Sequence, residues 1–340
     1  MKLILLSTPR YLAYCIAMLE KRQEKGLLVI THYFYHVQEY LDILNCSDEK
    51  QPFIEILDLC QEYCYIKKNY HRIKFRRNSL TKIKLLFNNY SIDTVITSDD
   101  GELYNQYALS LNKHGKNIYL EDGTGNYMKE KATLDFFKKP LFRTWRNQIL
   151  FFKDFQFSSC LGVNPYINEI YLSYPDYATI NYTKPTFSLS KEYFMYESLF
   201  INNILSFFKI SKETLSKIDL IILLDFVASD KQRREQYMDT ILDLCKKHFD
   251  KRIAIKRHPR DPHLYESIKT LGNTVFLPDV AFEFLIPLLS NTVIIGSAST
   301  ATMLASMLNQ QVFLVESGND YPEIYNLFKE IGIENYENKK

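Results

Sequence analysis

The chain alternates short, continuously apolar runs with stretches whose apolar residues recur at helical spacing. In the first half, the apolar runs predict strands at residues 3–6, 27–31, 54–57, 94–97 and 117–120. The stretches between them predict helices at residues 11–21, 37–44, 80–87 and 103–111, because one face of each is apolar. Strands without polar alternation are buried on both faces, so this order predicts an α/β fold with a parallel sheet.

The second half shows the same alternation. Strands are predicted at residues 220–224, 253–256, 274–276, 293–295 and 312–315, and helices at residues 230–249, 263–271, 281–289, 301–308 and 321–331. Between the halves, residues from about 136 to 217 are aromatic and polar, with Pro165, Pro175 and Pro185 among them. We therefore expect two Rossmann-like domains, at residues 1–172 and 218–340, which a linker at residues 173–217 joins and which face each other across a cleft.

The amino-acid composition limits the kinds of molecule that the protein is expected to bind. Lys and Arg number 42 and Asp and Glu number 40 in 340 residues, a formal net charge of +2. A protein that gains affinity by neutralising many phosphates carries a larger basic excess, so we expect no nucleic-acid partner. No apolar run reaches the roughly 20 residues that span a bilayer, and the six cysteines are scattered. These features indicate a cytoplasmic protein with reduced thiols and no metal site.

An acidic turn follows the strand predicted at residues 117–120. Glu121 and Asp122 are adjacent, and Gly123 begins the Gly-Thr-Gly-Asn segment behind them. Ligands of such sheets bind at the carboxyl ends of strands, and repulsion between neighbouring acids raises the pKa of one of them, as a general base requires. A solvated turn fits the same residues, and Asp99-Asp100-Gly101 repeats the acid-acid-glycine pattern after another strand.

A basic segment at residues 256–260 follows the strand predicted at residues 253–256. His258 stands among Lys and Arg residues, which lower the pKa of a histidine unless an anion binds between them. With a phosphate in place, the histidine can be protonated, hold that phosphate and give a proton to a leaving group. Pro259 fixes the turn. A basic surface turn is the alternative interpretation.

Two predicted helices begin with residues that suit either an anion or a cap. Glycine and small hydroxyl residues precede the helix at residues 301–308, namely Gly296, Ser297, Ser299 and Thr300. Free N–H groups at a helix start bind phosphate, although ordinary N-capping explains the same hydroxyl groups. Asp230 lies in the first turn of the helix at residues 230–249, behind a capping box of Ser229 and Gln232. The helix dipole is a structural reason for an acid at that position.

The segment Phe136–Lys153 interleaves aromatic rings with cations and contains the single tryptophan, Trp145. Rings at the level of the lipid headgroups and cations on anionic lipid suit a membrane interface. A partly buried helix with a basic outer face explains the segment equally well.

Taken together, these segments resemble bacterial sialyltransferases of the GT-B type, most closely glycosyltransferase family 52, which includes lipooligosaccharide α-2,3-sialyltransferases. The segment 121–126 is similar to the acid-acid-glycine motif of the family, and His258-Pro259-Arg260 is similar to its His-Pro motif. The Asp99 triplet lacks the Thr-Gly-Asn tail. The resemblance implies a GT-B fold with an acceptor-side first domain and a nucleotide-sugar-binding second domain.

The resemblance also implies roles for single residues. CMP-sialic acid would be the donor, without a metal or another cofactor, and His258 would hold its phosphate and act as general acid. Glu283 would hold the ribose of the donor. Further donor contacts would come from Gly123, Pro259, Gly296, Ser297, Ser299 and Thr300. The general base stays open between Asp230 and Glu121, with Asp122 beside the latter.

The leading hypothesis is an inverting transferase that moves sialic acid to a galactose-type hydroxyl of a lipid-linked lipooligosaccharide or capsule glycan. A transferase that uses CMP-Kdo or a nucleotide-hexose is an alternative. A non-catalytic subunit of glycan assembly that docks on the cytoplasmic face of the inner membrane through Phe136–Lys153 is another. The family resemblance is also compatible with a homodimer.

Overall fold

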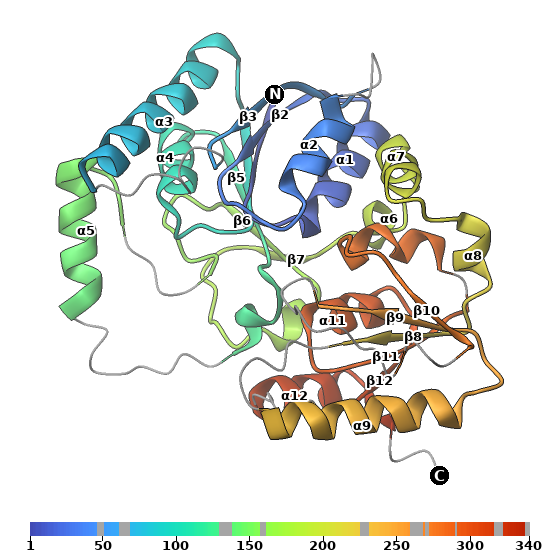
Figure 1. Cartoon of the computed structure of the whole chain (residues 1–340). Coiled ribbons are helices and arrows are strands. Elements are labelled where there is room, and N and C mark those ends of the chain that lie inside the picture. The colour runs from blue at the N-terminus through green and yellow to red at the C-terminus, as the bar shows by residue number, and fades with distance from the viewer. Residues whose placement is uncertain are drawn as a thin grey trace. The chain divides into compact units, whose positions relative to one another are not determined.

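The computed structural model describes residues 1–45, 51–60, 69–128, 138–156, 161–224, 231–258, 268, 272–289, 291–315 and 322–336. They fall into two compact units, Met1–Ser190 and Lys191–Lys340, each built on its own parallel sheet (Figure 1). The predicted α/β class with two Rossmann-like domains is therefore confirmed. Of the segment 173–217, predicted as a linker, residues 173–190 belong to the first unit and residues 191–217 to the second.

The first unit has a seven-stranded sheet in the order β3-β2-β1-β4-β5-β6-β7 with parallel neighbours. Helices α1 and α2 lie on one side of the sheet and α3 and α4 on the other (Figure 1). The order reverses between β1 and β4, so the carboxyl ends of these strands border the crevice where such sheets bind ligands. The strands are β1 (Lys2–Leu6), β2 (Gly26–Ile30), β3 (Phe53–Asp58), β4 (Thr94–Thr97), β5 (Lys116–Leu120), β6 (Glu169–Leu172) and β7 (Thr186–Ser188), and the helices are α1 (Arg10–Arg22), α2 (Val37–Asn45), α3 (Asn69–Asn89), α4 (Leu103–Leu111) and α5 (Lys138–Leu150).

Two strands and half of a helix of the first unit are absent from the sequence prediction. β6 alternates buried and half-buried residues, and β7 is a three-residue edge strand, so neither forms a continuous apolar run. α3 begins at Asn69 rather than at residue 80, because its first half is largely exposed and its buried apolar residues start at Leu80. Hydrophobic periodicity can therefore indicate only the second half of α3.

The second unit has a six-stranded parallel sheet in the order β10-β9-β8-β11-β12-β13. Its order reverses between β8 and β11, which places a second ligand-binding crevice at the carboxyl ends of those strands. The strands are β8 (Leu220–Leu223), β9 (Ile253–Lys256), β10 (Thr274–Phe276), β11 (Val293–Gly296), β12 (Gln311–Leu314) and β13 (Glu334–Asn335), and the helices are α6 (Lys191–Phe194), α7 (Leu199–Phe207), α8 (Lys212–Ser216), α9 (Lys231–Lys247), α11 (Thr300–Met307) and α12 (Pro322–Glu330).

One predicted helix of the second unit is wrong. Residues 281–289 form two single turns of 3-10 helix, η5 (Phe282–Phe284) and η6 (Ile286–Leu288), instead of one α-helix. Pro287 lies in the second turn, where it has no N–H group to give to an α-helical hydrogen bond. The helix predicted at residues 263–271 lies outside the described residues, apart from Ile268.

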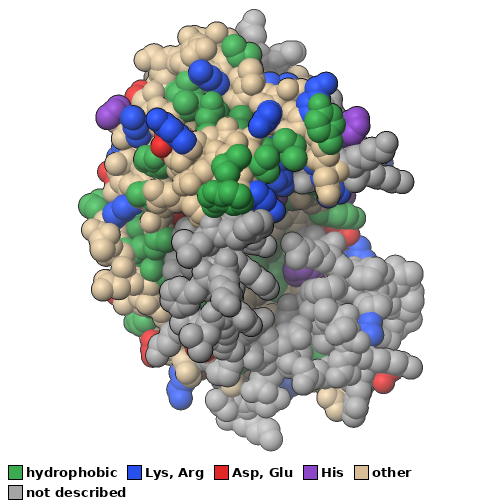
Figure 2. Space-filling model, turned by 90° about the vertical axis from the view of Figure 1, so that its left-hand side faces the viewer, with side chains coloured by type: hydrophobic (Ala, Val, Ile, Leu, Met, Phe, Trp, Pro, Cys, Tyr) green, Lys and Arg blue, Asp and Glu red, His purple; other side chains and the backbone are tan. Residues whose placement is uncertain are grey.

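Helices α3 and α5 form a basic surface on the first unit. Neither helix contains Asp or Glu, whereas both contain several Lys and Arg residues. Figure 2 shows Lys and Arg side chains spread over this face. Arg77 Nε of α3 donates to the carbonyl oxygen of Leu150 at 2.8 Å, which ties the two helices together. Among the described residues, no helix is long and apolar enough to cross a membrane.

Candidate functional site

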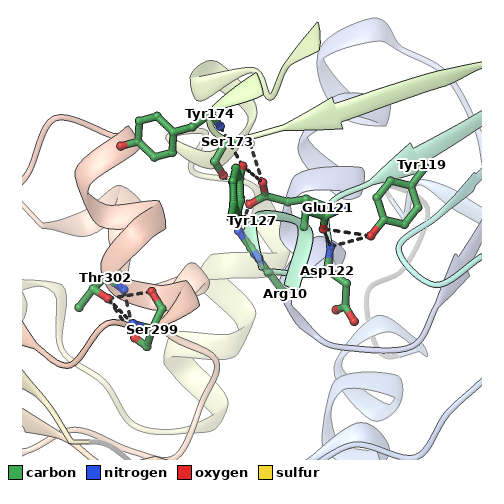
Figure 3. A network of polar contacts seen from close by, with 10 residues as sticks. Arg10, Tyr119, Glu121, Asp122, Tyr127, Ser173, Tyr174, Ser299 and Thr302 are labelled. Atoms are coloured by element: carbon green, nitrogen blue, oxygen red, sulfur yellow. Dashed lines mark hydrogen bonds and ion pairs between the residues drawn. The ribbon is translucent and has the colours of Figure 1, made fainter. Parts of the chain in front are cut away.

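Glu121 lies at the carboxyl end of β5 and is completely buried. Its Oε1 accepts hydrogen bonds from Arg10 Nη2 at 2.8 Å and from Ser173 Oγ at 2.5 Å. Its Oε2 accepts from the Tyr127 hydroxyl at 2.6 Å and from the backbone N–H of Ser173 at 2.7 Å (Figure 3). A carboxylate has about four lone-pair positions, and all of them are occupied here.

The donors to Glu121 come from three separate elements. Arg10 begins α1 just after β1, Ser173 follows β6, and Tyr127 ends η2 (Gly123–Tyr127). Glu121 therefore fastens the ends of β1, β5 and β6 to one another. We infer that it positions this edge of the sheet, because none of its lone pairs is left for a substrate hydroxyl. Sequence analysis missed Arg10, Tyr127 and Ser173, which lie far from the acidic turn or carry no motif.

Asp122 differs from Glu121 in its exposure to solvent and in the hydrogen bonds of its side chain. Its backbone N–H donates to the Tyr119 hydroxyl and to Asn126 Oδ1, both at 3.1 Å, while its exposed side chain points away from the Glu121 network (Figure 3). Desolvation of the carboxylate and the nearby charge of Asp99 raise the pKa of Asp122 to about 6. A carboxylate with such a pKa can accept a proton near neutral pH.

The backbone conformation of the acidic turn requires glycine at position 123. Gly123 has a φ of 72° and is buried, a backbone conformation that side chains with a Cβ rarely adopt. The turn carries the chain into η2, from which Tyr127 reaches back to Glu121. The predicted donor contact of Gly123 stays a prediction.

The second acid-acid-glycine triplet supports the loops of the first unit. Asp100 is completely buried, and its two oxygens accept the backbone N–H groups of Gly162 at 3.0 Å and Asn164 at 2.8 Å. Asp99 Oδ1 accepts the backbone N–H groups of Gly101 at 3.0 Å and Glu102 at 3.2 Å. These bonds are a structural reason for an acid at both positions.

In the second unit, charged residues gather at the carboxyl ends of β9 and β10. His258 is half-buried and follows β9. Lys256 is only 4% exposed, and burial lowers its pKa to about 8, although the charges of Asp279 and Glu283 oppose this shift. Arg257 Nη2 pairs with Asp279 Oδ2 at 2.6 Å. These charged residues include Lys256 of the predicted basic segment and the predicted residues His258 and Glu283, whereas Asp279 was not predicted as a site residue.

The start of α11 lies at the reversal point of the second sheet. A Cβ atom on Gly296 would stand 2.7 Å from Thr302 Cγ2 and 3.0 Å from Leu223 Cβ, so only glycine lets the chain pass so close to β8. Ser299 and Thr302 form a reciprocal capping box, with Ser299 N to Thr302 Oγ1 at 2.9 Å (Figure 3). Ser297 is buried. The predicted N-cap is confirmed, and the phosphate contacts of Gly296, Ser297, Ser299 and Thr300 stay predictions.

Two predicted site residues, Asp230 and Pro259, lie outside the described residues. His258 and the start of α11 lie at the same edge of the second sheet, because β9 and β11 both neighbour β8 in parallel. Among the described side chains, no three His, Cys, Asp or Glu residues gather as metal ligands would.

Comparisons with known proteins agree with this architecture. The sequence model of glycosyltransferase family 52 matches residues 43–316. Among curated proteins, none matches the sequence at a significant level. The GT-B domain of a sialyltransferase from Photobacterium damselae has a similar structure, with a TM-score of 0.57, 11% identity and coverage of 98% of this chain and 98% of that chain.

UDP-GlcNAc 2-epimerase from Methanocaldococcus jannaschii is a second similar structure. Its TM-score is 0.54 at 14% identity, and the match covers 98% of this chain and 88% of that chain. Likeness at such low identity establishes the fold alone, and that fold is of the GT-B type.

Proposed function

The chain belongs to glycosyltransferase family 52, and from this premise we propose that it moves sialic acid from CMP-sialic acid to a hydroxyl group of a bacterial surface glycan. The reaction class, glycosyl transfer of the sialyltransferase type, follows from the family. The choice of donor rests on the second unit, where His258 and the start of α11 border one edge of the sheet. This arrangement is the observation that carries the proposal.

The second unit offers groups that match a nucleoside monophosphate. The N-terminus of α11, at the reversal point between β8 and β11, presents N–H groups to the single phosphate of CMP. The ammonium group of Lys256, two residues before His258, adds positive charge at the carboxyl end of β9. Glu283, which lies close enough to Lys256 to affect its pKa, can accept hydrogen bonds from the ribose hydroxyl groups. One phosphate carries little enough charge for these groups to neutralise it without a metal ion.

The proposed reaction is a single displacement. His258, protonated while it holds the donor phosphate, gives its proton to the phosphate oxygen as the bond from that oxygen to the anomeric carbon breaks. The acceptor hydroxyl attacks the anomeric carbon from the opposite face, and a carboxylate takes the hydroxyl proton. The products are CMP and a sialoside with inverted anomeric configuration.

We propose Asp122 as the carboxylate that takes this proton, with Asp230 as the alternative. Glu121 is the weaker candidate, because four donors from the protein already occupy its oxygens. Asp122 is exposed beside it, with a pKa of about 6. Glu121 then serves as a positioning residue that holds the backbone of the acidic turn in place.

Binding of CMP tests the donor assignment. We expect CMP to raise the melting temperature in buffer that contains EDTA, because a ligand at about 100 times its Kd stabilises the folded state by about 2.7 kcal/mol. Differential scanning fluorimetry measures the shift, and cytidine without the phosphate should give a smaller one. A shift with UDP but none with CMP would favour the nucleotide-hexose alternative, and no shift with any nucleotide would favour a non-catalytic subunit.

We also propose that the basic surface of α3 and α5 holds the protein at the cytoplasmic face of a membrane. Trp145 and Ile149 are 59% and 61% exposed, and their spacing of four residues puts them on one face of α5. Both helices carry several Lys and Arg residues, and no acidic residue lies in either helix. Such a surface suits anionic lipid headgroups.

Vesicle flotation tests the membrane proposal. Wild-type protein should float with vesicles of phosphatidylglycerol and phosphatidylethanolamine at low salt and remain below with pure phosphatidylcholine. The double variant Trp145→Gln and Ile149→Gln should lose most of this binding, since each ring or aliphatic chain that enters the interface contributes about 1 kcal/mol or more. Phe249→Gln is the matched control, because Phe249 is an exposed aromatic residue of the second unit. Equal flotation of all three proteins would disprove the assignment.

A further inference from the structure

A cavity of about 330 Å³ in the first unit belongs to none of the sites described above. It lies at the carboxyl edge of the sheet, where the loops after β2 and β4 meet helices α3 and α5. Its polar lining consists of His32, Arg76, Glu102, Arg146 and Asn147. Arg146 and Asn147 lie in the segment Phe136–Lys153, which the sequence suggested as a membrane-facing segment. The other three residues belong to none of the predicted motifs.

The charge of this cavity favours an anion. Arg76 and Arg146 are permanently cationic, and Glu102 is the acidic residue of the lining. Burial, together with the nearby charge of Asp99, raises the pKa of Glu102 to about 8, although its backbone hydrogen bonds and the charge of Arg76 oppose this shift. Glu102 Oε2 also accepts the backbone N–H groups of Tyr104 at 2.5 Å and Asn105 at 3.3 Å, which fixes it as the cap of α4.

Asn147 adds a second, independent indication of a ligand. The residue is 9% exposed, and its Oδ1 has no hydrogen-bond partner among the described residues. A buried acceptor without a partner costs about 1–3 kcal/mol, and a ligand hydroxyl would remove this cost. Two guanidinium groups and one amide oxygen together fit a ligand that carries both an anionic group and hydroxyl groups, as acidic or phosphorylated sugars do.

The position of the cavity connects it to the acidic turn. Asp99 binds the backbone of Gly101 and Glu102, at the rim of the cavity. Asp99 follows β4 and Asp122 follows β5, and these strands are parallel neighbours. The rim of the cavity and the proposed base therefore lie at the same edge of the sheet.

We propose that this cavity binds the anionic group of the acceptor glycan, a carboxylate or a phosphate ester on a sugar, through Arg76 and Arg146, with Asn147 accepting from a neighbouring hydroxyl. The acceptor role rests on the proposed function, whereas binding of the anionic sugar does not. The cavity would then select charged acceptors and hold them at the edge of the sheet that carries Asp122.

Direct binding tests the cavity without any need for transfer. Titration calorimetry with galactose 6-phosphate, galacturonate and galactose should show binding of one or both anions and none, or far weaker binding, of galactose. Arg146→Gln should weaken anion binding about 10–100-fold, as expected for a lost charged hydrogen bond. Arg146 is exposed on its helix, so this variant should keep its melting temperature. Arg22→Gln is the matched control, because Arg22 is an exposed arginine at the far end of α1.

The stronger of the two anions identifies the group that the cavity recognises. Asn147→Leu should weaken binding of both anionic sugars but not of inorganic phosphate, which lacks the neighbouring hydroxyl. Equal affinity for galactose and the anions, or anion binding that Arg146→Gln leaves unchanged, would overturn the assignment.

Transfer assays then test the acceptor role. With CMP-sialic acid as donor, the KM should be about tenfold lower or more for an anionic galactoside than for its neutral counterpart, and Arg146→Gln should remove this preference. Equal KM values in wild-type protein would disprove the role in acceptor selection. Anion binding without transfer from any donor would instead disprove the proposed function and leave the cavity as a sugar-anion site.

Discussion

Replacement of Asp122 by Asn is expected to slow transfer about 10²–10⁴-fold, the usual cost of losing a general base, with no change in melting temperature. The side chain is exposed and points away from the hydrogen bonds that support the turn (Figure 3). Asparagine has the same shape but cannot take the proton. Initial rates with CMP-sialic acid, measured alongside thermal unfolding, separate the chemical effect from any loss of structure.

The dependence of kcat/KM on pH provides a second test of Asp122 as the base. Asp122 must be ionised to act as a base, and its pKa is raised to about 6. In the wild-type protein, kcat/KM should therefore rise with pH up to about 6, which gives the acidic limb of a bell-shaped profile. In Asp122→Asn this limb should disappear.

Glu121→Gln is the matched comparison and should show the opposite pattern. Breaking a buried ion pair costs about 3–5 kcal/mol, so the melting temperature should fall by roughly 10 °C for a unit of this size. The acidic limb of the pH profile should remain in whatever activity survives. If Asp122→Asn keeps wild-type rates and Asp230→Asn loses them, the base is Asp230 and our assignment is wrong.

Replacement of His258 by Gln should have an effect of similar size. We expect kcat to fall about 10²–10⁴-fold, because the leaving phosphate would lose its proton donor, and CMP to bind more weakly. The alkaline limb of the pH profile, where the general acid loses its proton, should be lost as well. Steady-state rates and CMP titration measure the two effects separately.

His248 provides the control for His258 in the same unit. It lies just after α9, near the amino end of β9, where its Nε2 and the Tyr336 hydroxyl are 2.5 Å apart. His248→Gln should therefore leave kcat unchanged. Wild-type transfer by His258→Gln would rule out the proposed general acid.

Most of the architecture could be predicted from the sequence, because buried parallel strands consist of uninterrupted runs of apolar residues. All ten predicted strands are present in the structure. Two of the failures have physical causes. β6 and β7 were not predicted, because β6 alternates and β7 is short, and Pro287 breaks the helix expected at residues 281–289. A continuous apolar run predicts a strand that is buried on both faces, but it cannot predict a strand that is half exposed.

The candidate site was predicted only in part. The sequence located the acidic turn and the His258 segment at strand ends, but it could not tell Glu121 from Asp122. That distinction depends on Arg10 and Ser173, which are 111 and 52 positions away along the chain. Pairings over such separations leave no local pattern, and neither do the residues that line the cavity of α3 and α5.

The bonds of Glu121 restrict the substitutions that this chain tolerates. Arg10, Tyr127 and Ser173 each satisfy a lone pair that no water can reach, so a substitution at any one of them strands a buried charge or hydroxyl. Such changes are tolerated only when a second position compensates. We therefore expect the effects of substitutions at these four positions on stability to be non-additive.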